Sequence, residues 1–306
     1  MSRLLLRGDW VRVRSAAEIA ATLDDDGCLD GLPFMPEMVR LCGQRLQVSR
    51  RADKTCVEGY GLRRLQGAVH LDEVRCDGSA HDGCQRNCLI FWKEAWLEPV
   101  AGPGADPAPA ERADLPRLPT RLGRRYRCQS TELGGASAPL SPWDVAHLAK
   151  DVLRRELSVG GLAAMVCRIL TNRLRRAIGL PDLQALQGSG QAPARPGLGL
   201  QPGERVRVRS AQEISGTLGP SGKAAGLSFE PEMTGYVGGV YEVEFRVERI
   251  ILEETGKMVR LSDTVALKGL SCRGSCVKNC PRANTLYWRE SWLERVEARA
   301  KSAAAA

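Results

Sequence analysis

The sequence predicts a mainly β protein with an α-helical insert, in which two SH3-like small barrels flank a helical middle segment. Two observations lead to this prediction: the chain contains an internal repeat, and each copy consists of short β-rich runs separated by Gly, Asp and Asn turns. The length of 306 residues agrees with two or three domains. With 43% hydrophobic and 26% charged residues, the composition is that of a folded globular chain and excludes wholesale disorder.

The repeat begins with the string GDWVRVRS at residue 8, which returns as GERVRVRS at residue 203. Between Gly8 and Arg51, 21 of 44 positions are identical to the residue 195 positions further along the chain. One extra residue in the second copy then moves the offset to 196, so that Cys76 matches Cys272. The closing strings FWKEAWLEPV and YWRESWLERV also match. We therefore expect the two copies to share one fold.

Local patterns predict the elements within a copy. The string VRVRS alternates apolar and basic residues and predicts a half-buried strand with Arg12 and Arg14 on the solvent side. Ser15 followed by Glu18 is a capping box and predicts a short helix that ends near Leu23. Further strands are predicted over residues 45–49, 68–74 and 89–92 in the first copy and 240–251, 258–261 and 265–270 in the second.

Two segments rich in Pro, Gly and Ala, residues 101–116 and 187–202, are predicted to be linkers. They divide the chain into a first barrel over 1–100, a helical middle segment over 117–186 and a second barrel over 203–298. In the middle segment we expect helices over residues 141–157 and 162–178. The second helix has an apolar face and an Arg-rich face, and we expect its apolar face to cover one of the barrels.

The eleven cysteines are the most informative feature of the composition. We expect a cytoplasmic protein, because the sequence contains no recognisable signal peptide and no apolar run of membrane-spanning length. In a reducing compartment, clustered thiols are more often metal ligands or catalytic groups than disulfides.

Seven of the thiols occur in two sets, on equivalent parts of the two copies. The first copy offers a four-thiol metal site formed by Cys56, Cys76, Cys84 and Cys88. The second copy offers three thiols, and we expect a fourth from the polar string RRYRCQSTEL of the middle segment; this set is Cys128, Cys272, Cys276 and Cys280. Thiolates on short polar loops repel one another until a cation compensates them, which favours metal binding at such loops. The other three thiols, Cys28, Cys42 and Cys167, are expected to be buried and structural.

The spacings leave two metals open. Structural zinc favours pairs of cysteines separated by two to four residues, as in Cys84 to Cys88 and Cys276 to Cys280. Iron–sulfur clusters are also held by cysteines alone, and a cysteine followed by proline, as at Cys280, occurs in bacterial ferredoxins. We expect an iron–sulfur cluster or zinc at two sites, with the cluster slightly favoured.

Other features suggest alternative functions. The paired tryptophans of each copy, the exposed arginines and the net charge of +8 allow nucleic-acid binding through stacking and phosphate contacts. Acidic residues interleave with the basic ones, as in DDD at 24–26, so the sequence does not define a basic patch. No nucleotide-binding or hydrolase motif supports an enzyme.

The strings GLPFMPEM, KTC, RCDGSAH, CQSTEL and YWRE resemble an uncharacterised bacterial family of tandem-repeat, cysteine-rich, SH3-like proteins. The resemblance covers nearly the whole chain outside the two linkers. It implies the architecture with two sites, including Cys128, and it implies no reaction. The chain departs from the family in the second copy, where only RGS separates Cys272 from Cys276.

Three hypotheses for function follow. The first is an accessory protein with two cysteine-ligated metal sites, acting with a protein partner in electron transfer or assembly within a biosynthetic pathway. The second is a zinc-stabilised module that binds nucleic acid or a carrier protein. The third, with the least support, is an iron–sulfur-dependent enzyme.

Overall fold

The computed structural model describes residues 4–72, 74–104, 118–141, 144, 146–183, 185–186, 188–190, 196–274 and 278–296. The chain is mainly β and contains several sheets, as predicted. Its contacts form two compact units. The first unit comprises Met1–Cys167, Arg249–Arg260 and Arg273–Asn284, and the second comprises Arg168–Glu248, Leu261–Cys272 and Thr285–Ala306. The predicted domain boundaries remain a prediction.

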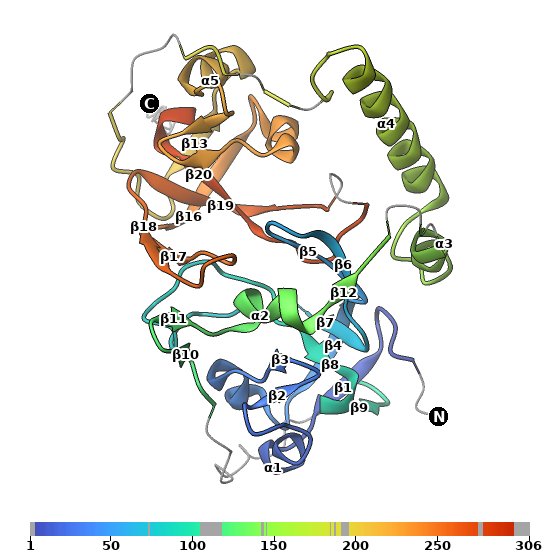
Figure 1. The fold of residues 1–306 in the computed structure, drawn as a ribbon. Coiled ribbons are helices and arrows are strands. Elements are labelled where there is room, and N and C mark those ends of the chain that lie inside the picture. The colour runs from blue at the N-terminus through green and yellow to red at the C-terminus, as the bar shows by residue number, and fades with distance from the viewer. Residues whose placement is uncertain are drawn as a thin grey trace, which may run out of the picture. The chain divides into compact units, whose positions relative to one another are not determined.

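The first unit is built on a five-stranded antiparallel sheet (Figure 1). In sheet order its strands are β8 (Trp92–Lys93), β7 (Ala68–Leu71), β4 (Arg45–Arg51), β1 (Trp10–Val13) and β9 (Leu97–Val100). Val11 pairs with Leu46 on one side and with Pro99 on the other. The register of β4 against β7 shifts between Val48 and Arg50, as it does at a β-bulge.

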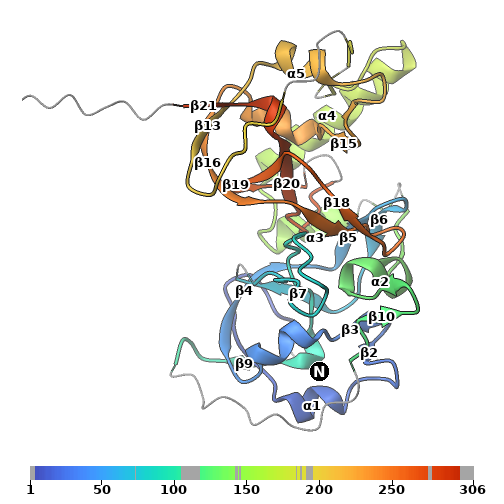
Figure 2. The ribbon, with the colours of Figure 1, turned by 90° about the vertical axis from the view of Figure 1, so that its left-hand side faces the viewer.

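Short elements surround this sheet. The helices and 3-10 helices of the first unit are α1 (Ala16–Ala20), η1 (Pro36–Leu41), η2 (Glu94–Trp96), α2 (Gln129–Ala136) and α3 (Ala146–Leu153). The smaller strand groups are β2 (Cys28–Leu29) with β3 (Leu32–Pro33), β5 (Lys54–Val57) with β6 (Gly61–Arg64) and β12 (Ala138–Pro139), β10 (Arg121–Leu122) with β11 (Arg125–Tyr126), and β17 (Arg249–Ile251) with β18 (Met258–Arg260). Figure 2 shows α2 packed beside β3, at the edge of the first unit's core.

The second unit contains a five-stranded sheet with a corresponding strand order. Its strands are β20 (Thr285–Arg289), β19 (Thr264–Ser271), β16 (Val240–Arg246), β13 (Arg205–Val208) and β21 (Leu293–Arg295). Its other elements are α5 (Ala211–Thr217), β14 (Lys223–Ala224), β15 (Leu227–Ser228), η3 (Pro231–Tyr236) and η5 (Glu290–Trp292). The helix α4 (Val159–Ala177) contains the boundary between the two units.

The predicted capping box of Ser15 and Glu18 is confirmed. The Ser15 hydroxyl accepts a hydrogen bond from the Glu18 backbone N–H at 3.2 Å, and the Glu18 carboxylate accepts one from the Ser15 N–H at 2.9 Å. Ser210 and Glu213 repeat the motif at the start of α5. Each box satisfies backbone donors that the first helical turn leaves without a partner.

The paired tryptophans form the centre of each hydrophobic core. Trp92 and Trp96 are 0% exposed in the first unit, and Trp288 and Trp292 are 0% exposed in the second. The Trp96 indole donates a hydrogen bond to Thr22 Oγ1 at 3.1 Å. Rings buried in this way are not available to stack on a base or a sugar, so the suggested stacking platform is wrong.

The structure corrects two further expectations about the elements. The expected strand over 240–251 is interrupted after Arg246, and its last residues form β17, which pairs with β18 in the first unit. The run VYEVEFRVERII contains no Gly or Pro, so it gave no local signal for that break. The apolar face of α4 is only partly covered: Met165 is buried, whereas Leu170 is 58% and Leu174 is 65% exposed.

Among the described residues, none of the helices combines the length and apolar character that crossing a membrane requires. The first linker lies largely outside the described residues, since residues 105–117 are not among them.

Candidate metal centre

Four thiols of the first unit line one small cavity of about 30 Å³. They are Cys76, Cys84, Cys88 and Cys128. The rest of the wall combines apolar side chains, such as Phe91 and Ile251, with the guanidinium of Arg282. Four sulfur ligands around a mostly apolar space are the donor set of a structural zinc site or of an iron–sulfur cluster.

The loop that carries three of these thiols has a tight turn that only glycine accommodates. Gly78 has φ +68°, and a Cβ at this position would lie 2.1 Å from the carbonyl oxygen of Cys84. The Cys76 N–H donates to the Cys88 carbonyl at 2.9 Å, directly after the bridge between Arg75 and Leu89. The turn therefore brings the first and last thiols of the loop back to one side of the cavity.

The fourth thiol, Cys128, reaches the cavity from the start of α2. The Cys128 N–H donates to Thr131 Oγ1 at 3.0 Å at this helix terminus. The next residue, Gln129, fixes the helix against the loop, because its amide oxygen accepts the Phe91 N–H at 2.8 Å and its amide nitrogen donates to the Phe91 carbonyl at 2.8 Å. The positive end of the helix dipole favours a thiolate at Cys128.

The β17–β18 hairpin closes the cavity on another side. The Ile251 N–H donates to Cys84 Sγ at 3.3 Å, and the Gln85 N–H donates to the Arg249 carbonyl at 3.0 Å. The hairpin belongs to the second copy of the sequence repeat, whereas the cysteine loop belongs to the first. A backbone N–H directed at a cysteine sulfur stabilises the thiolate form that a metal requires.

The pKa values of the thiols show that thiolates are unfavourable in this cavity when no cation is bound. Burial, together with the charge of Cys88, raises the pKa of Cys128 to about 12. Burial raises the pKa of Cys76 far above its ordinary value, with added repulsion from Glu37 and Cys88. Burial also raises the pKa of Cys84. Cys76, Cys84 and Cys128 are therefore neutral thiols at pH 7 unless a bound cation stabilises their charges.

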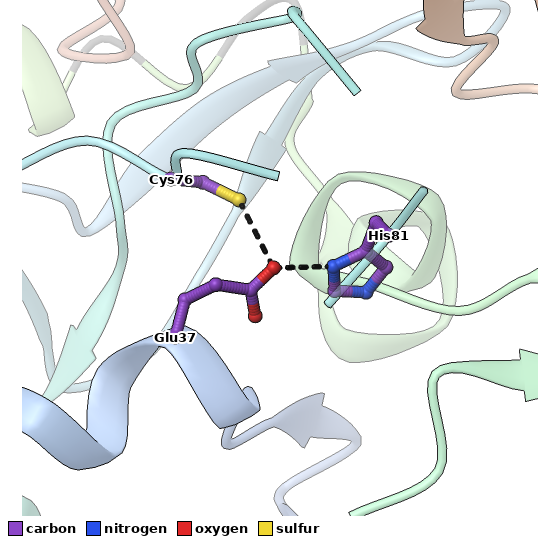
Figure 3. A group of neighbouring side chains, drawn as sticks. All are labelled: Glu37, Cys76 and His81. Carbon is purple, nitrogen blue, oxygen red and sulfur yellow. Dashed lines mark hydrogen bonds and ion pairs between the residues drawn. The ribbon is translucent and has the colours of Figure 1, made fainter. Parts of the chain in front are cut away.

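Glu37, Cys76 and His81 form a cluster of neighbouring side chains (Figure 3), and Cys76 and His81 also line the cavity. His81 Nδ1 lies 2.6 Å from Glu37 Oε1, and Cys76 Sγ lies 3.8 Å from the same oxygen. His81 Nε2 lies 2.9 Å from the Arg127 carbonyl, which can only accept, so this nitrogen carries a proton. Within the described part of the chain, this is the one group of three or more such side chains whose ligand atoms all lie within 4.8 Å of one another.

Two arginines at equivalent positions of the repeat connect the loops to the hairpins. Arg282 Nη1 donates to the Cys56 carbonyl at 2.9 Å and to Glu253 Oε1 at 3.0 Å. Arg86 Nη1 donates to the Ile251 carbonyl at 3.0 Å, and its Nη2 donates to Glu253 Oε2 at 3.1 Å. Burial acts to lower the pKa of Arg282, but the Glu253 carboxylate and the nearby Cys88 and Cys56 thiols raise it above its ordinary value.

The structure groups the thiols differently from the sequence expectation. Cys56 lies beside Cys280, with the Cys56 N–H donating to Cys280 Sγ at 3.2 Å, and it does not line the four-thiol cavity. Cys128, which was expected to join the second set, lines the cavity together with Cys76, Cys84 and Cys88. The reason is an exchange between the copies: the β5–β6 hairpin packs on the loop of Cys280, and the β17–β18 hairpin packs on the loop of Cys84.

The remaining thiols fall into three groups. Cys276 lies outside the described residues, and Cys272 belongs to the second unit, where it is half-buried. Cys28 and Cys42 are buried, as expected, and burial raises the pKa of each to about 11. Cys167 is exposed on α4, so its expected burial is wrong; its helix neighbours Val166 and Leu170 are exposed as well, so this part of the helix surface is not covered.

Sequence reasoning missed Glu37, Arg282 and the hairpin residue Ile251. The comparison of the two sequence copies contains a signal for each of the two charged residues, Glu37 and Arg282. Glu37 occurs in the PEM string that both copies retain, and Arg282 matches Arg86 at the offset of 196. No local pattern indicates which hairpin covers which loop, because Ile251 and Cys84 are separated by 167 residues.

Comparison with known proteins gave no matching family model, no matching curated protein and no matching solved structure.

Proposed function

We propose that the first unit binds a cysteine-ligated metal centre through Cys76, Cys84, Cys88 and Cys128. The observation that carries this proposal is the convergence of these four thiols on one cavity, from a loop and from the start of a helix far along the chain. The alternative, four buried thiols with no ligand, gives no reason for bringing polar sulfur groups from two segments into one apolar space.

The charge around the cavity supports an anionic centre. Arg282 is 3% exposed and lines the cavity, and its Nε has no hydrogen-bond partner among the described residues. A buried guanidinium N–H without a partner is costly in an apolar environment. Four thiolates with a metal centre carry net negative charge, which this side chain would offset.

The spacing of the thiols favours an iron–sulfur cluster over a single zinc ion. Tetrahedral zinc with bonds of about 2.3 Å holds its sulfurs about 3.8 Å apart. Of the described side chains, only Glu37, Cys76 and His81 have all their ligand atoms within 4.8 Å, so no three of the four sulfurs are that close. A cluster places several irons between the cysteines and separates their sulfurs more widely.

A second centre is proposed on the second thiol loop. Cys56 and Cys280 lie together and would both be ligands, in place of the pairing of Cys128 with Cys280. Cys272 and Cys276 remain ligands predicted from the sequence alone. With two such centres, the protein would act in electron transfer, or in assembly with a protein partner within a biosynthetic pathway.

The fold would serve as the frame for these centres. We interpret the two five-stranded sheets, with strand orders β8-β7-β4-β1-β9 and β20-β19-β16-β13-β21, as two SH3-like barrels that arose by repetition. Both orders place the first strand of the copy next to the last, which is the closure that a small barrel needs.

Anaerobic purification with metal and sulfide analysis and a visible spectrum tests the proposal. We expect bound iron and sulfide with broad absorption at about 400 nm. Cys128→Ser should lose the first centre, whereas Cys167→Ser, at an exposed thiol outside the cavity, should keep both.

The same experiment can reject the proposal at two levels. Colourless protein with two bound zinc ions would exclude the cluster and keep the cysteine-ligated centres. Protein purified anaerobically without any bound metal, or metal content unchanged in Cys128→Ser and in Cys84→Ser, would exclude the centre itself.

A further inference from the structure

The buried side chain of Glu253 joins the two cysteine loops of the first unit. Its Oε1 accepts a hydrogen bond from Arg282 Nη1 at 3.0 Å, and its Oε2 accepts one from Arg86 Nη2 at 3.1 Å. Arg86 follows Cys84 by two residues, and Arg282 follows Cys280 by two residues, at equivalent positions of the repeat. One carboxylate therefore lies between two equivalent parts of the protein.

A hydrogen-bonded path leads from Glu253 to a sulfur of the thiol cavity. Arg86 Nη1 donates to the Ile251 carbonyl at 3.0 Å, and the Ile251 N–H donates to Cys84 Sγ at 3.3 Å. Arg86, Ile251 and Cys84 all line the cavity. This path ends at a proposed ligand of the first centre.

The other cysteine loop repeats these contacts. Arg282 Nη1 donates to the Cys56 carbonyl at 2.9 Å, and the Cys56 N–H donates to Cys280 Sγ at 3.2 Å. Arg282 also lines the thiol cavity, so its side chain adjoins both sites. This path ends at two proposed ligands of the second centre, and all of its contacts lie within the first unit.

Glu253 also contacts the segment that carries the fourth thiol of the cavity. The Ser130 hydroxyl donates to Glu253 Oε2 at 3.0 Å, and Arg282 Nη2 donates to Ser130 Oγ at 2.6 Å. Ser130 follows Cys128 by two residues at the start of α2, and it lines the thiol cavity. The charge of one buried carboxylate is therefore connected to every segment that supplies a thiol to the first centre, and to Cys280.

We propose that the two metal centres form one redox pair, in which an electron passes from one centre to the other across the bridge of Arg86, Glu253 and Arg282. The inference rests on the proposed function, because it needs a centre at each end of the bridge. The transfer oxidises one centre by one electron and reduces the other by one, so it balances without a further reactant.

The shared charge gives this pair a physical basis. The reduction potential of a cluster depends on its net charge and on the hydrogen bonds to its sulfurs. Charges in a protein interior also interact more strongly than charges in water. A carboxylate joined to both sites through buried hydrogen bonds should therefore act on both potentials.

Reduction of the anaerobically purified, full-length protein with dithionite tests the inference, with electron paramagnetic resonance as the readout. Cys128→Ser should retain only the second centre, and Cys56→Ser should retain only the first. The spectrum of the fully reduced wild type should differ from the sum of the spectra of these variants, because neighbouring unpaired electrons interact. A wild-type spectrum equal to that sum would overturn the inference.

Glu253→Gln tests the bridge itself. Loss of the negative charge should raise the potentials of both centres, each by at least about 59 mV, which is a tenfold change in a one-electron equilibrium. Glu98→Gln, at a partly exposed carboxylate paired with Arg12 away from the cavity wall, should leave both potentials unchanged. A shift at one centre only, or at neither, would overturn the proposed bridge.

Metal and sulfide analysis separates this inference from the proposed function. Wild-type protein with fewer than two centres would reject the proposed pair of centres, and the inference with it. Two bound clusters with additive spectra would keep the proposed function and reject the inference alone. If Glu253→Gln fails to fold, the comparison of spectra with the single-centre variants still decides.

Discussion

Beside the thiol cavity, the carboxylate of Glu253 joins several polar side chains in one network. Glu253 is 3% exposed and accepts hydrogen bonds from Arg282, Arg86 and the Ser130 hydroxyl. Its pKa is set by two opposing effects: burial raises it, and the charge of Arg282 lowers it to a net value below the ordinary one. Buried charges of this kind destabilise a fold when one partner is removed, so the network fixes the positions of the groups it joins.

His70 provides a test of pH dependence at a single residue. It is 0% exposed on β7, its Nδ1 lies 2.9 Å from the Ile90 carbonyl, and burial lowers its pKa to about 4. The unfolded chain binds a proton near pH 6.5, whereas the folded chain does so only near pH 4. The stability that the neutral His70 contributes is therefore present above pH 6.5 and is lost as the pH falls towards 4.

We expect the free energy of unfolding to fall between pH 6.5 and 4.5 by up to about 1.4 kcal/mol per pH unit on account of this group. His70→Phe should reduce that slope, as measured by denaturant unfolding at several pH values. Cys42→Ala, at a buried group that does not titrate in this range, should lower stability and keep the slope. An equal slope in His70→Phe and the wild type would contradict the prediction.

At the scale of elements, the two cysteine loops share one turn geometry. Gly274 has φ +66°, and a Cβ there would lie 2.1 Å from the Cys280 carbonyl oxygen, as a Cβ at Gly78 would from that of Cys84. The hairpins that cover the loops are also equivalent, since β5 supplies the N–H of Cys56 and β17 supplies that of Ile251. A shared turn with exchanged hairpins explains how similar sequences can build two related sites.

The turn glycine can be tested against a glycine of the same loop. Gly78→Ala should abolish metal binding at the first centre, because the added Cβ meets backbone atoms that cannot move without opening the loop. Gly83→Ala has a similar φ of +69° and open space around its Cβ, so it should cost only about 1 kcal/mol and keep the metal. Metal analysis and thermal unfolding of both variants provide the comparison.

Equal metal loss in the two glycine variants would show that backbone strain alone, rather than the close approach to Cys84, decides the result.

At the scale of the whole molecule, each unit has its own hydrophobic core. The first core includes Trp92 and Trp96, and the second includes Trp288 and Trp292. The four-thiol cavity lies in the first unit, and none of its lining residues belongs to the second core. Metal binding should therefore stabilise the first unit much more than the second.

Removal of the metal with an oxidant and a chelator tests this difference. Amides of the cysteine loop, residues 76–88, and of the hairpin over 249–260 should exchange hydrogen at least tenfold faster, because local opening no longer requires release of a bound ion. Amides of β13 and β16 should keep their protection. Hydrogen exchange followed by mass spectrometry measures both; equal loss of protection in the two sets would contradict the assignment.

Much of the local structure was predictable, because its causes are local. The alternation in VRVRS and the Ser15–Glu18 capping box act within a few residues, and both appear in the structure as β1 and the start of α1. The large apolar area of the tryptophan side chains is enough by itself to predict that they lie in a core. The strand over 240–251 was misjudged because its interruption depends on pairing with β18 in another unit.

The sequence by itself determined that the protein is mainly β, that its thiols gather on equivalent loops, and that Cys28 and Cys42 lie in the interior. Only the tertiary structure decided which thiol completes which set, and it placed Cys128 with the first loop and Cys56 beside Cys280. The physical reason is that contacts between segments more than a hundred residues apart depend on how the hairpins pack. Spacing along the chain carries no information about that packing.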